Sequence, residues 1–129
     1  MKKSKNSSHL AATTLAGEPR TIPESFLQTV TRVPNRLAIR NTQSQVHEPE
    51  EIRYCDLDVL SDRVAAALLD QGVQKGDRVI LQSFPRIRTA ATLLGIFKAG
   101  ACAVPLDPSL TVTETQAIVE DAQPRSLCE

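Results

Sequence analysis

Residues 97–107, FKAGACAVPLD, carry the strongest fold signal in this sequence. We expect a helix to run through Lys98 and to end at Gly100, because glycine adopts the left-handed conformation at little cost. Residues 101–104 then predict a short strand that is buried on both faces. Pro105 is expected to end its ladder, because proline has no N–H to donate. A helix, a glycine stop and a buried strand in this order indicate half of a parallel α/β layer.

The region before this stretch predicts a helix and a hairpin. Thr21 and Glu24 have the spacing of a capping box, and a helix is expected to follow as far as Pro34. Residues 37–40 and 52–54 predict the two strands of a hairpin with a long polar tip. The apolar face of the helix is expected to comprise Phe26, Leu27, Val30 and Val33.

Two further helices flank a strand in the middle of the chain. The first is expected to be capped by Asp56 and to end at Gly72, with an apolar stripe of Leu57, Leu60, Val64 and Leu68. Residues 78–84 predict a strand whose centre, residues 79–81, is buried on both faces. The next helix is expected over residues 87–99, with inner positions Ala90, Leu93, Leu94 and Phe97.

The end of the chain repeats this alternation of helix and strand. Thr111 and Glu114 have capping-box spacing and begin a fourth helix, and residues 125–129 predict the entrance to another strand. Alternating strands and helices imply right-handed crossovers and a parallel sheet. We therefore predict an α/β fold with a partial parallel sheet and flanking helices. Ligands of such sheets bind beyond the carboxyl ends of the strands, here near residues 83–84 and 104–107.

The composition argues against several classes of function. Lys and Arg total 15, as do Asp and Glu, so no overall field favours nucleic acid or an anionic membrane. Only 3% of the residues are aromatic, which is few for stacking bases. Three widely spaced cysteines argue against a disulfide framework, and no apolar run approaches the roughly 20 residues of a membrane span. We expect a cytoplasmic protein with no nucleic-acid or membrane partner.

Residues 1–20 predict a disordered basic and polar tail, followed by one incomplete domain over residues 21–129. Three lysines precede the first acid, Glu18, and the segment has little apolar surface to bury. A targeting peptide is the alternative. However, the apolar stretch is short and rich in threonine, and arginines at helical spacing are missing.

Lys98, Asp107 and Cys102 each allow a functional and a structural interpretation. Lys98 has the chemistry of a nucleophile or phosphate ligand, but a lysine near a helix end also satisfies terminal carbonyls and the macrodipole. Asp107 follows a strand end, as functional groups often do, but Asp-Pro also begins a turn. Cys102 is expected to be an apolar filler inside a buried strand. The structural interpretation is favoured in all three cases.

The remaining candidates predict no site. The sequence lacks the GxxxxGK[ST] and GxGxxG motifs, and the glycines at residues 72–76 lie between a helix and a strand, where a turn is expected. Neither histidine is placed for general base catalysis. His47 and the acids near it could form a metal site, but a solvated acidic loop is favoured. The other histidine is His9, and the acids near His47 are Glu48, Glu50 and Glu51. Cys55 and Cys128 have no neighbouring His or Cys in the sequence. We assign no catalytic, cofactor-binding or metal-binding residue.

Four segments in register resemble adenylate-forming enzymes, most closely the adenylation domains of nonribosomal peptide synthetases. Residues 97–107 look like the motif LKAGxAYVPLD of that family, with Phe97 in place of Leu and Ala103 in place of Tyr. The other three segments are IRYCDLD at residues 52–58, similar to LTYxEL; GVQKGDRVIL at residues 72–81, similar to GVxPGDRVxL; and TIPESF at residues 21–26, similar to the usual domain opening.

The resemblance implies the start of the large N-terminal lobe of a ligase. Such enzymes activate a carboxylic acid with MgATP to an acyl-adenylate and pass the acyl group to the thiol of phosphopantetheine or coenzyme A. The family's phosphate loop, substrate pocket and C-terminal lysine come later in its sequence, so we expect them beyond residue 129. We therefore transfer no catalytic residue, expect these cofactors only for a full-length enzyme, and expect this chain alone to be inactive.

Three assignments remain open for the whole protein. The first is a peptide synthetase of specialised metabolism, whose remainder would be the partner of this segment. The second is the front of an acyl-CoA ligase. The third is a small non-catalytic α/β protein that binds a partner over its open sheet. A parallel strand normally has neighbours on both sides, so we expect the chain made alone to be marginally stable and prone to associate.

Overall fold

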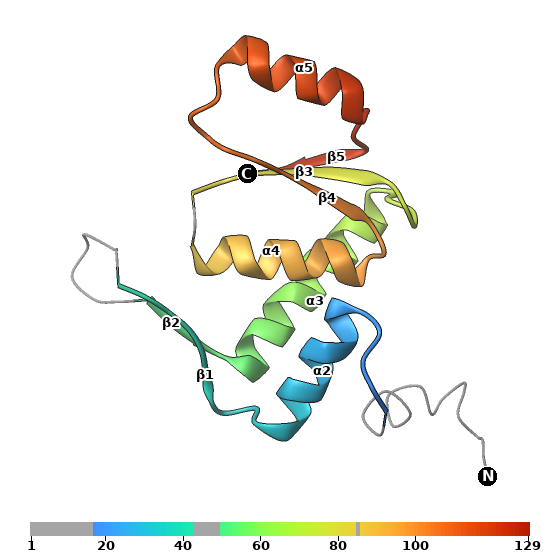
Figure 1. Ribbon diagram of the computed structural model, residues 1–129. Helices are drawn as coiled ribbons and strands as arrows, with labels where there is room; N and C mark the ends of the chain where they lie inside the picture. Colours follow the sequence, from blue (N-terminus) through green and yellow to red (C-terminus); the bar gives the residue numbers. More distant parts are fainter. Residues whose placement is uncertain (1–16, 43–49, 85) are drawn as a thin grey trace.

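A three-stranded parallel sheet with the order β4-β3-β5 organises the protein (Figure 1). The structure is a computed structural model that describes residues 17–42, 50–84 and 86–129. The strands are β3 (Arg78–Gln82), β4 (Cys102–Leu106) and β5 (Ser126–Cys128). Val79 and Ile80 of β3 are 0% exposed, which confirms the strand with a centre buried on both faces. A strand with neighbours on both sides can be this apolar because helices also cover its faces.

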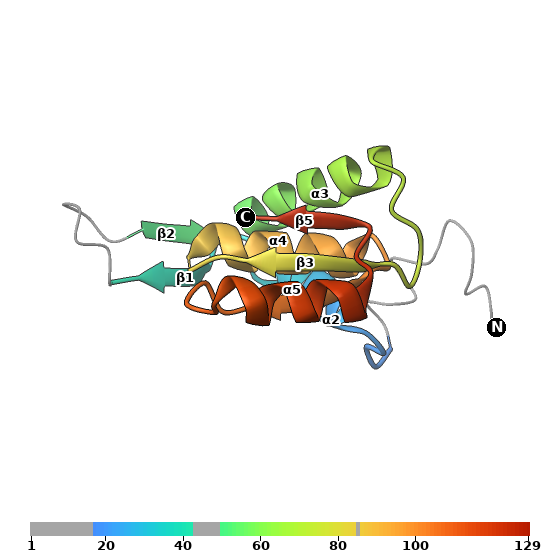
Figure 2. The same cartoon turned by 90° about the horizontal axis from the view of Figure 1, so that it is seen from above.

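Helices α4 (Ile87–Lys98) and α5 (Val112–Ala122) lie on opposite faces of this sheet (Figure 1). They connect β3 to β4 and β4 to β5. Figure 2 shows that the axes of α4, β3 and α5 are nearly parallel, with both helices running opposite to the strand. The long helix α3 (Tyr54–Asp70) packs on α4. The main core lies between the sheet and these two helices and comprises Ala65, Leu68, Val73, Val79, Leu81, Ile96 and Ala99.

The N-terminal part forms a second, smaller layer. Helix α2 (Ile22–Arg32) begins with the predicted capping box, in which the Glu24 N–H donates to the Thr21 hydroxyl over 3.2 Å. Strands β1 (Leu37–Asn41) and β2 (Glu50–Arg53) form an antiparallel hairpin, as expected. A second core joins this hairpin to α3 and α4 and comprises Ile52, Leu57, Ile87 and Ala91.

Helices α3 and α4 lie in close contact at Gly95. A Cβ atom at this position would lie 2.5 Å from the Cβ of Val64 and 2.9 Å from the carbonyl oxygen of Ser61. Ser61 is 0% exposed, and its hydroxyl donates to the Asp58 carbonyl over 2.9 Å, so its polar atom is satisfied within α3. The absence of a side chain at Gly95 therefore permits the contact between the two helices.

The start of α3 differs from the prediction. The helix begins at Tyr54, not after Asp56, and its N-cap Arg53 makes no side-chain cap. The N–H groups of Tyr54 and Cys55 instead donate to the carbonyls of Arg36 and Pro34, over 3.1 and 2.9 Å. Backbone from the α2–β1 turn thus replaces a capping side chain, which explains why Asp56, the expected cap, lies three residues after the true one.

Strand β4 also differs from the prediction. It continues through Pro105, which pairs with Leu81, and Cys102 is exposed although a fully buried strand was expected. In the described part of the chain β4 pairs only with β3, so it is an edge strand. Proline is tolerated on an edge, where one side of the backbone needs no partner. Strand β3 is shorter than expected, ending at Gln82 instead of residue 84.

The buried face of α4 is shifted relative to the prediction. Ala90, Leu93, Leu94 and Phe97 are half-buried, whereas the fully buried residues are Ile87, Ala91, Gly95 and Ile96. The shift follows from the position of α4, which contacts α3 as well as the sheet and so uses two sides. Both predicted helix stops are confirmed, since Gly72 and Gly100 have φ angles of 89° and 77°.

Replacing Gly95 with alanine tests the contact between α3 and α4. On an exposed helix surface this change stabilises by about 1 kcal/mol, because alanine favours the helix. Here we expect a loss of about 1–2 kcal/mol in the free energy of unfolding, because the methyl group overpacks the contact. Urea unfolding followed by circular dichroism measures it. The double variant Gly95→Ala/Val64→Ala should lose less than the sum of the single variants, and strict additivity would contradict the proposed clash.

Candidate functional site

The path of the chain singles out one end of the sheet as a ligand site. From β3 the chain crosses to β4 on one side, and it then returns across β3 to β5 on the other side. The crossover direction therefore reverses between β3 and β5. In open parallel sheets, ligands bind at such a reversal, beyond the carboxyl ends of the strands. Those ends are Gln82 of β3 and Cys128 of β5.

An open hollow of about 390 Å³ lies at this position. Its lining combines polar, charged and aromatic side chains: Gln82, Ser83, Phe84, Arg86, Pro108 and Glu129. The predicted site near residues 83–84 and 104–107 is consistent with this hollow. Ser83 and Phe84 line it, and residues 104–107 directly precede Pro108, which also lines it. Arg86 and Glu129 were not predicted, because no motif marks them and only the sheet topology brings them together.

Hydrogen bonds hold part of the loop that lines the hollow. The Thr89 hydroxyl donates to the carbonyl of Phe84 over 2.8 Å and lies 3.2 Å from the Ser83 hydroxyl. The Phe84 side chain is 66% exposed, and Arg86 caps α4 without a side-chain bond. The hollow therefore offers a ligand an exposed ring, a guanidinium and several polar groups.

Asp107 forms a turn, as its structural interpretation predicted. Its Oδ1 atom accepts hydrogen bonds from the backbone N–H and the hydroxyl of Ser109, each over 2.8 Å. The backbone N–H, followed by the hydroxyl, lowers the pKa of the Asp107 carboxyl below its ordinary value of 3.8. Asp107 is therefore a carboxylate whose Oδ1 fixes the exit from β4.

The start of α5 does not form a cradle for nucleotide phosphates. Such a cradle needs free N–H groups at the start of a helix. At α5 the N–H of Glu114 donates to the Thr111 hydroxyl over 3.2 Å, and the N–H of Thr111 donates to the Glu114 carboxylate over 2.8 Å. The glycines at 72 and 76 lie in the turns between α3 and β3, as predicted. We therefore derive no step through ATP from this part of the chain.

Lys98 links three helices. Its Nζ atom lies 2.6 Å from Oδ1 of Asp58 and 2.7 Å from Oδ1 of Asp62, and 5.4 Å from the centre of the Phe26 ring. The prediction that it bonds the carbonyls of its own helix end is wrong, because these partners belong to α3 and α2. Its charge still lies in the last turn of α4, where it complements the dipole. Lys98 thus ties α4 to α3 and to α2.

The three cysteines are free thiols, and none of them lines the hollow. Cys102 is exposed, so the prediction that it fills a buried position is wrong. Cys55 and Cys128 are half-buried, and burial raises the pKa of the Cys128 thiol. This favours its protonated, less nucleophilic form.

The predicted histidine positions fall outside the described residues. His9 and His47 lie in residues 1–16 and 43–49. Among residues 17–42, 50–84 and 86–129, no group of three or more His, Cys, Asp or Glu side chains could hold a metal ion. Glu51 of the acidic loop makes an ion pair with Arg40 over 2.6 Å. No helix in the described part of the chain is long and apolar enough to cross a bilayer.

Replacing Lys98 with methionine tests its role as a link between helices. We expect a loss of about 1–2 kcal/mol in the free energy of unfolding, because Asp58 and Asp62 lose a charged hydrogen-bond donor. Lys75→Met is the matched control, since Lys75 is exposed and makes no ion pair with the described residues. Equal losses in the two variants would contradict the assigned role.

Replacing Asp107 with alanine tests the turn after β4 through its pH dependence. A lowered pKa means that the folded state favours the carboxylate, so this group stabilises the fold above pH 3.8. That contribution is lost as the pH falls through the lowered pKa. We expect Asp107→Ala to be less stable than the parent at neutral pH, with a difference that shrinks in acid. Ser109→Ala should lower the free energy of unfolding by less than Asp107→Ala does. If the loss in Asp107→Ala did not change with pH, this account would be overturned.

Comparisons with known proteins agree on one family. Nonribosomal peptide synthetase gliP of Aspergillus fumigatus is 37% identical over 103 residues, which cover 79% of this chain and 4% of that protein. Cyclo-acetoacetyl-L-tryptophan synthase of Aspergillus oryzae is 32% identical over 111 residues, which cover 86% of this chain and 3% of that protein. The chain therefore spans only a few per cent of these curated relatives.

Solved structures with the same fold are also much longer than this chain. The fatty acid AMP ligase of Legionella pneumophila superposes with a TM-score of 0.77 at 25% identity, over 83% of this chain and 19% of that chain. A fatty acyl CoA synthetase of Mycobacterium tuberculosis superposes with a TM-score of 0.74 at 27% identity, over 82% and 20%. The family profile described as AMP-binding enzyme matches residues 26–128. Because this match spans most of its length, the chain belongs to the AMP-binding enzyme family.

Proposed function

We propose that this chain forms the beginning of the large N-terminal lobe of an acyl-adenylate-forming ligase of the nonribosomal peptide synthetase type. The observation that carries the proposal is the family match over residues 26–128, which includes the parallel sheet and its reversal point. The assignment to peptide synthetases rests on the curated relatives and on the motif at residues 97–107. An acyl-CoA ligase shares this part of the fold and is the nearest alternative.

In the complete enzyme, the reaction joins a carboxylic acid to AMP. MgATP would supply the adenylyl group: a carboxylate oxygen bonds to its α-phosphorus and pyrophosphate leaves. The acyl group then passes to the thiol of phosphopantetheine or coenzyme A, and AMP leaves. The described residues supply the scaffold for this chemistry. We propose that the remainder of a larger synthetase provides the phosphate loop, the substrate pocket and the catalytic lysine.

This assignment carries three further proposals about the chain. The chain alone does not catalyse adenylation, because the remainder of the enzyme provides the phosphate loop, the substrate pocket and the catalytic lysine. Residues 1–20 form a tail, and residues 21–129 form the incomplete first part of an adenylation domain. The protein works in the cytoplasm, which is supported by three free cysteines in the described structure.

The first test is the intact mass of the protein in its native source. An antibody raised against residues 21–129 would isolate it, and mass spectrometry would measure it. We expect a species far above 14.1 kDa that catalyses ATP–pyrophosphate exchange with one of a panel of amino, aryl, hydroxy and fatty acids. The 129-residue chain made alone is the control and should show no exchange.

A native species of 14.1 kDa without exchange activity would overturn the proposal. It would favour the third assignment, a non-catalytic protein that binds a partner. One feature fits that alternative: α5 covers one face of the sheet but buries none of its own residues. Pull-down of the native species under mild conditions would then identify the partner.

A further inference from the structure

We propose that Arg32, Arg36 and Arg53 form a docking surface for an acidic, extended segment of a partner protein. The three residues come from the end of α2, the turn that follows it, and the end of β2. All three are exposed. The proposal does not depend on the ligase activity proposed above.

Backbone contacts bring these three positions together. The N–H of Tyr54 donates to the Arg36 carbonyl over 3.1 Å, so Arg36 lies beside the junction of β2 and α3. The Arg53 guanidinium donates to the carbonyl of Asn35, which precedes Arg36 in the turn. The N–H of Arg36 donates to the Val33 carbonyl over 3.1 Å, which holds the turn against the last residues of α2. The arginine-bearing turn is therefore an ordered feature of the fold.

The positive charge of this surface is not neutralised by the described residues. Neither Arg32 nor Arg36 makes an ion pair with them, whereas Arg40 in the same hairpin pairs with Glu51 over 2.6 Å. The positive end of the α3 dipole lies at the same place and has no side-chain cap. Asp56 is the acidic residue in the first turn of α3. Its single negative charge leaves two of the three arginine charges unbalanced. In a chain with net charge zero, this is a local concentration of unpaired charge.

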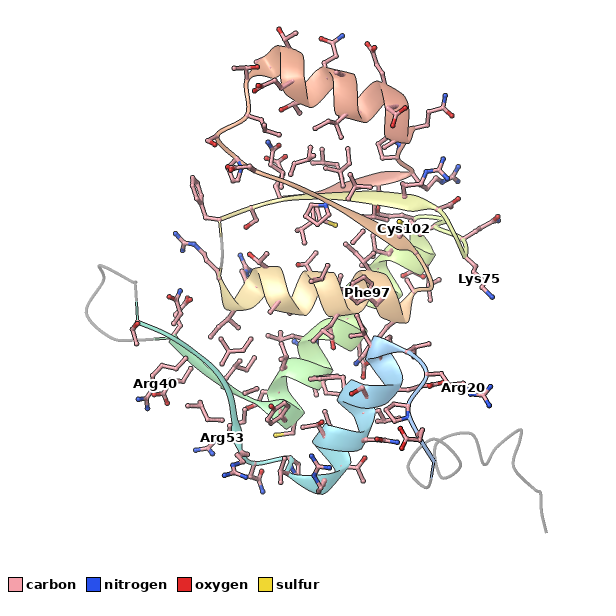
Figure 3. The ribbon with its side chains drawn as sticks, viewed as in Figure 1. Arg20, Arg40, Arg53, Lys75, Phe97 and Cys102 are labelled. Atoms are coloured by element: carbon pink, nitrogen blue, oxygen red, sulfur yellow. The ribbon has the colours of Figure 1, made fainter. Side chains whose placement is uncertain are left out.

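The shape of the surface favours a peptide over a small ligand. The three arginines lie on a turn and on two element ends, and none of them lines the hollow at the sheet. Figure 3 shows Arg53 at the hairpin, on the far side of α4 from the three-stranded sheet. An exposed guanidinium can bind a carboxylate with two parallel hydrogen bonds, so arginines on three neighbouring elements fit several Asp or Glu side chains of one peptide.

Nucleic acid is the less favoured occupant. Single-stranded DNA and RNA usually bind where aromatic rings provide stacking platforms beside basic groups. The aromatic residue at this junction, Tyr54, is half-buried, and its ring lies 6.2 Å from that of Phe26. The surface thus offers charge without an exposed ring for a base.

A binding experiment with matched charge variants tests this surface. The probe is a fluorescein-labelled peptide of alternating Glu and Gly, titrated with the full 129-residue chain and followed by fluorescence anisotropy. Arg32→Gln/Arg36→Gln is the test variant, because it leaves the Arg53 contact with the turn intact. Arg63→Gln/Arg88→Gln is the control, because it removes two exposed arginines from other parts of α3 and α4. Circular dichroism checks that each variant is folded.

We expect the test variant to bind the peptide about fivefold more weakly than the parent, and the control to change affinity by less than about twofold. Binding should also weaken as salt is raised, because exposed charges are screened. Equal weakening in both variants, or no binding at low salt, would overturn the proposal. So would tighter binding of a labelled oligothymidylate of equal charge, which would favour nucleic acid as the occupant.

Discussion

The contact between α3 and α4 at Gly95 is the constraint on which the rest of this fold depends. Without a side chain there, the α4 backbone comes so close to α3 that an added methyl group would lie 2.5 Å from Val64. This fixes the depth of α4, and Ile96, the next residue, is then completely buried against the sheet. Lys98, one turn further on, is thereby brought to Asp58 and Asp62 on α3. A single glycine thus positions both the core and the ion pairs.

The features that could be predicted from the sequence depend on local chemistry. Both capping boxes, the glycine stops and the buried centre of β3 are set by residues a few positions apart. The errors concern features set by distant neighbours. Helix α3 needs no capping side chain because the carbonyls of Arg36 and Pro34 accept hydrogen bonds from its first N–H groups. Pro105 remains in β4 because that strand is an edge. Neither neighbour is visible in the local sequence.

The candidate site divides in the same way. Its position at the carboxyl ends of the strands follows from the alternation of strands and helices, so it could be predicted. Its lining could not be predicted, since Arg86 follows β3 and Glu129 follows β5, and both line one hollow only because these two strands are neighbours. The family signature at residues 97–107 does not mark this lining. Its lysine and aspartate, Lys98 and Asp107, hold helices together and shape a turn.

The shallow seating of α5 has a consequence for the dynamics of the chain. Helices α3 and α4 each bury four residues, whereas α5 buries none. It is held by its capping box, by its own hydrogen bonds and by the bond from the Arg78 guanidinium to the Ala122 carbonyl. Elements with little buried apolar surface open at a lower free energy than the core. The amides of α5 should therefore exchange with solvent through local opening while β3 and α4 stay closed. In this chain, the face of β3 under α5 is the one that water reaches first.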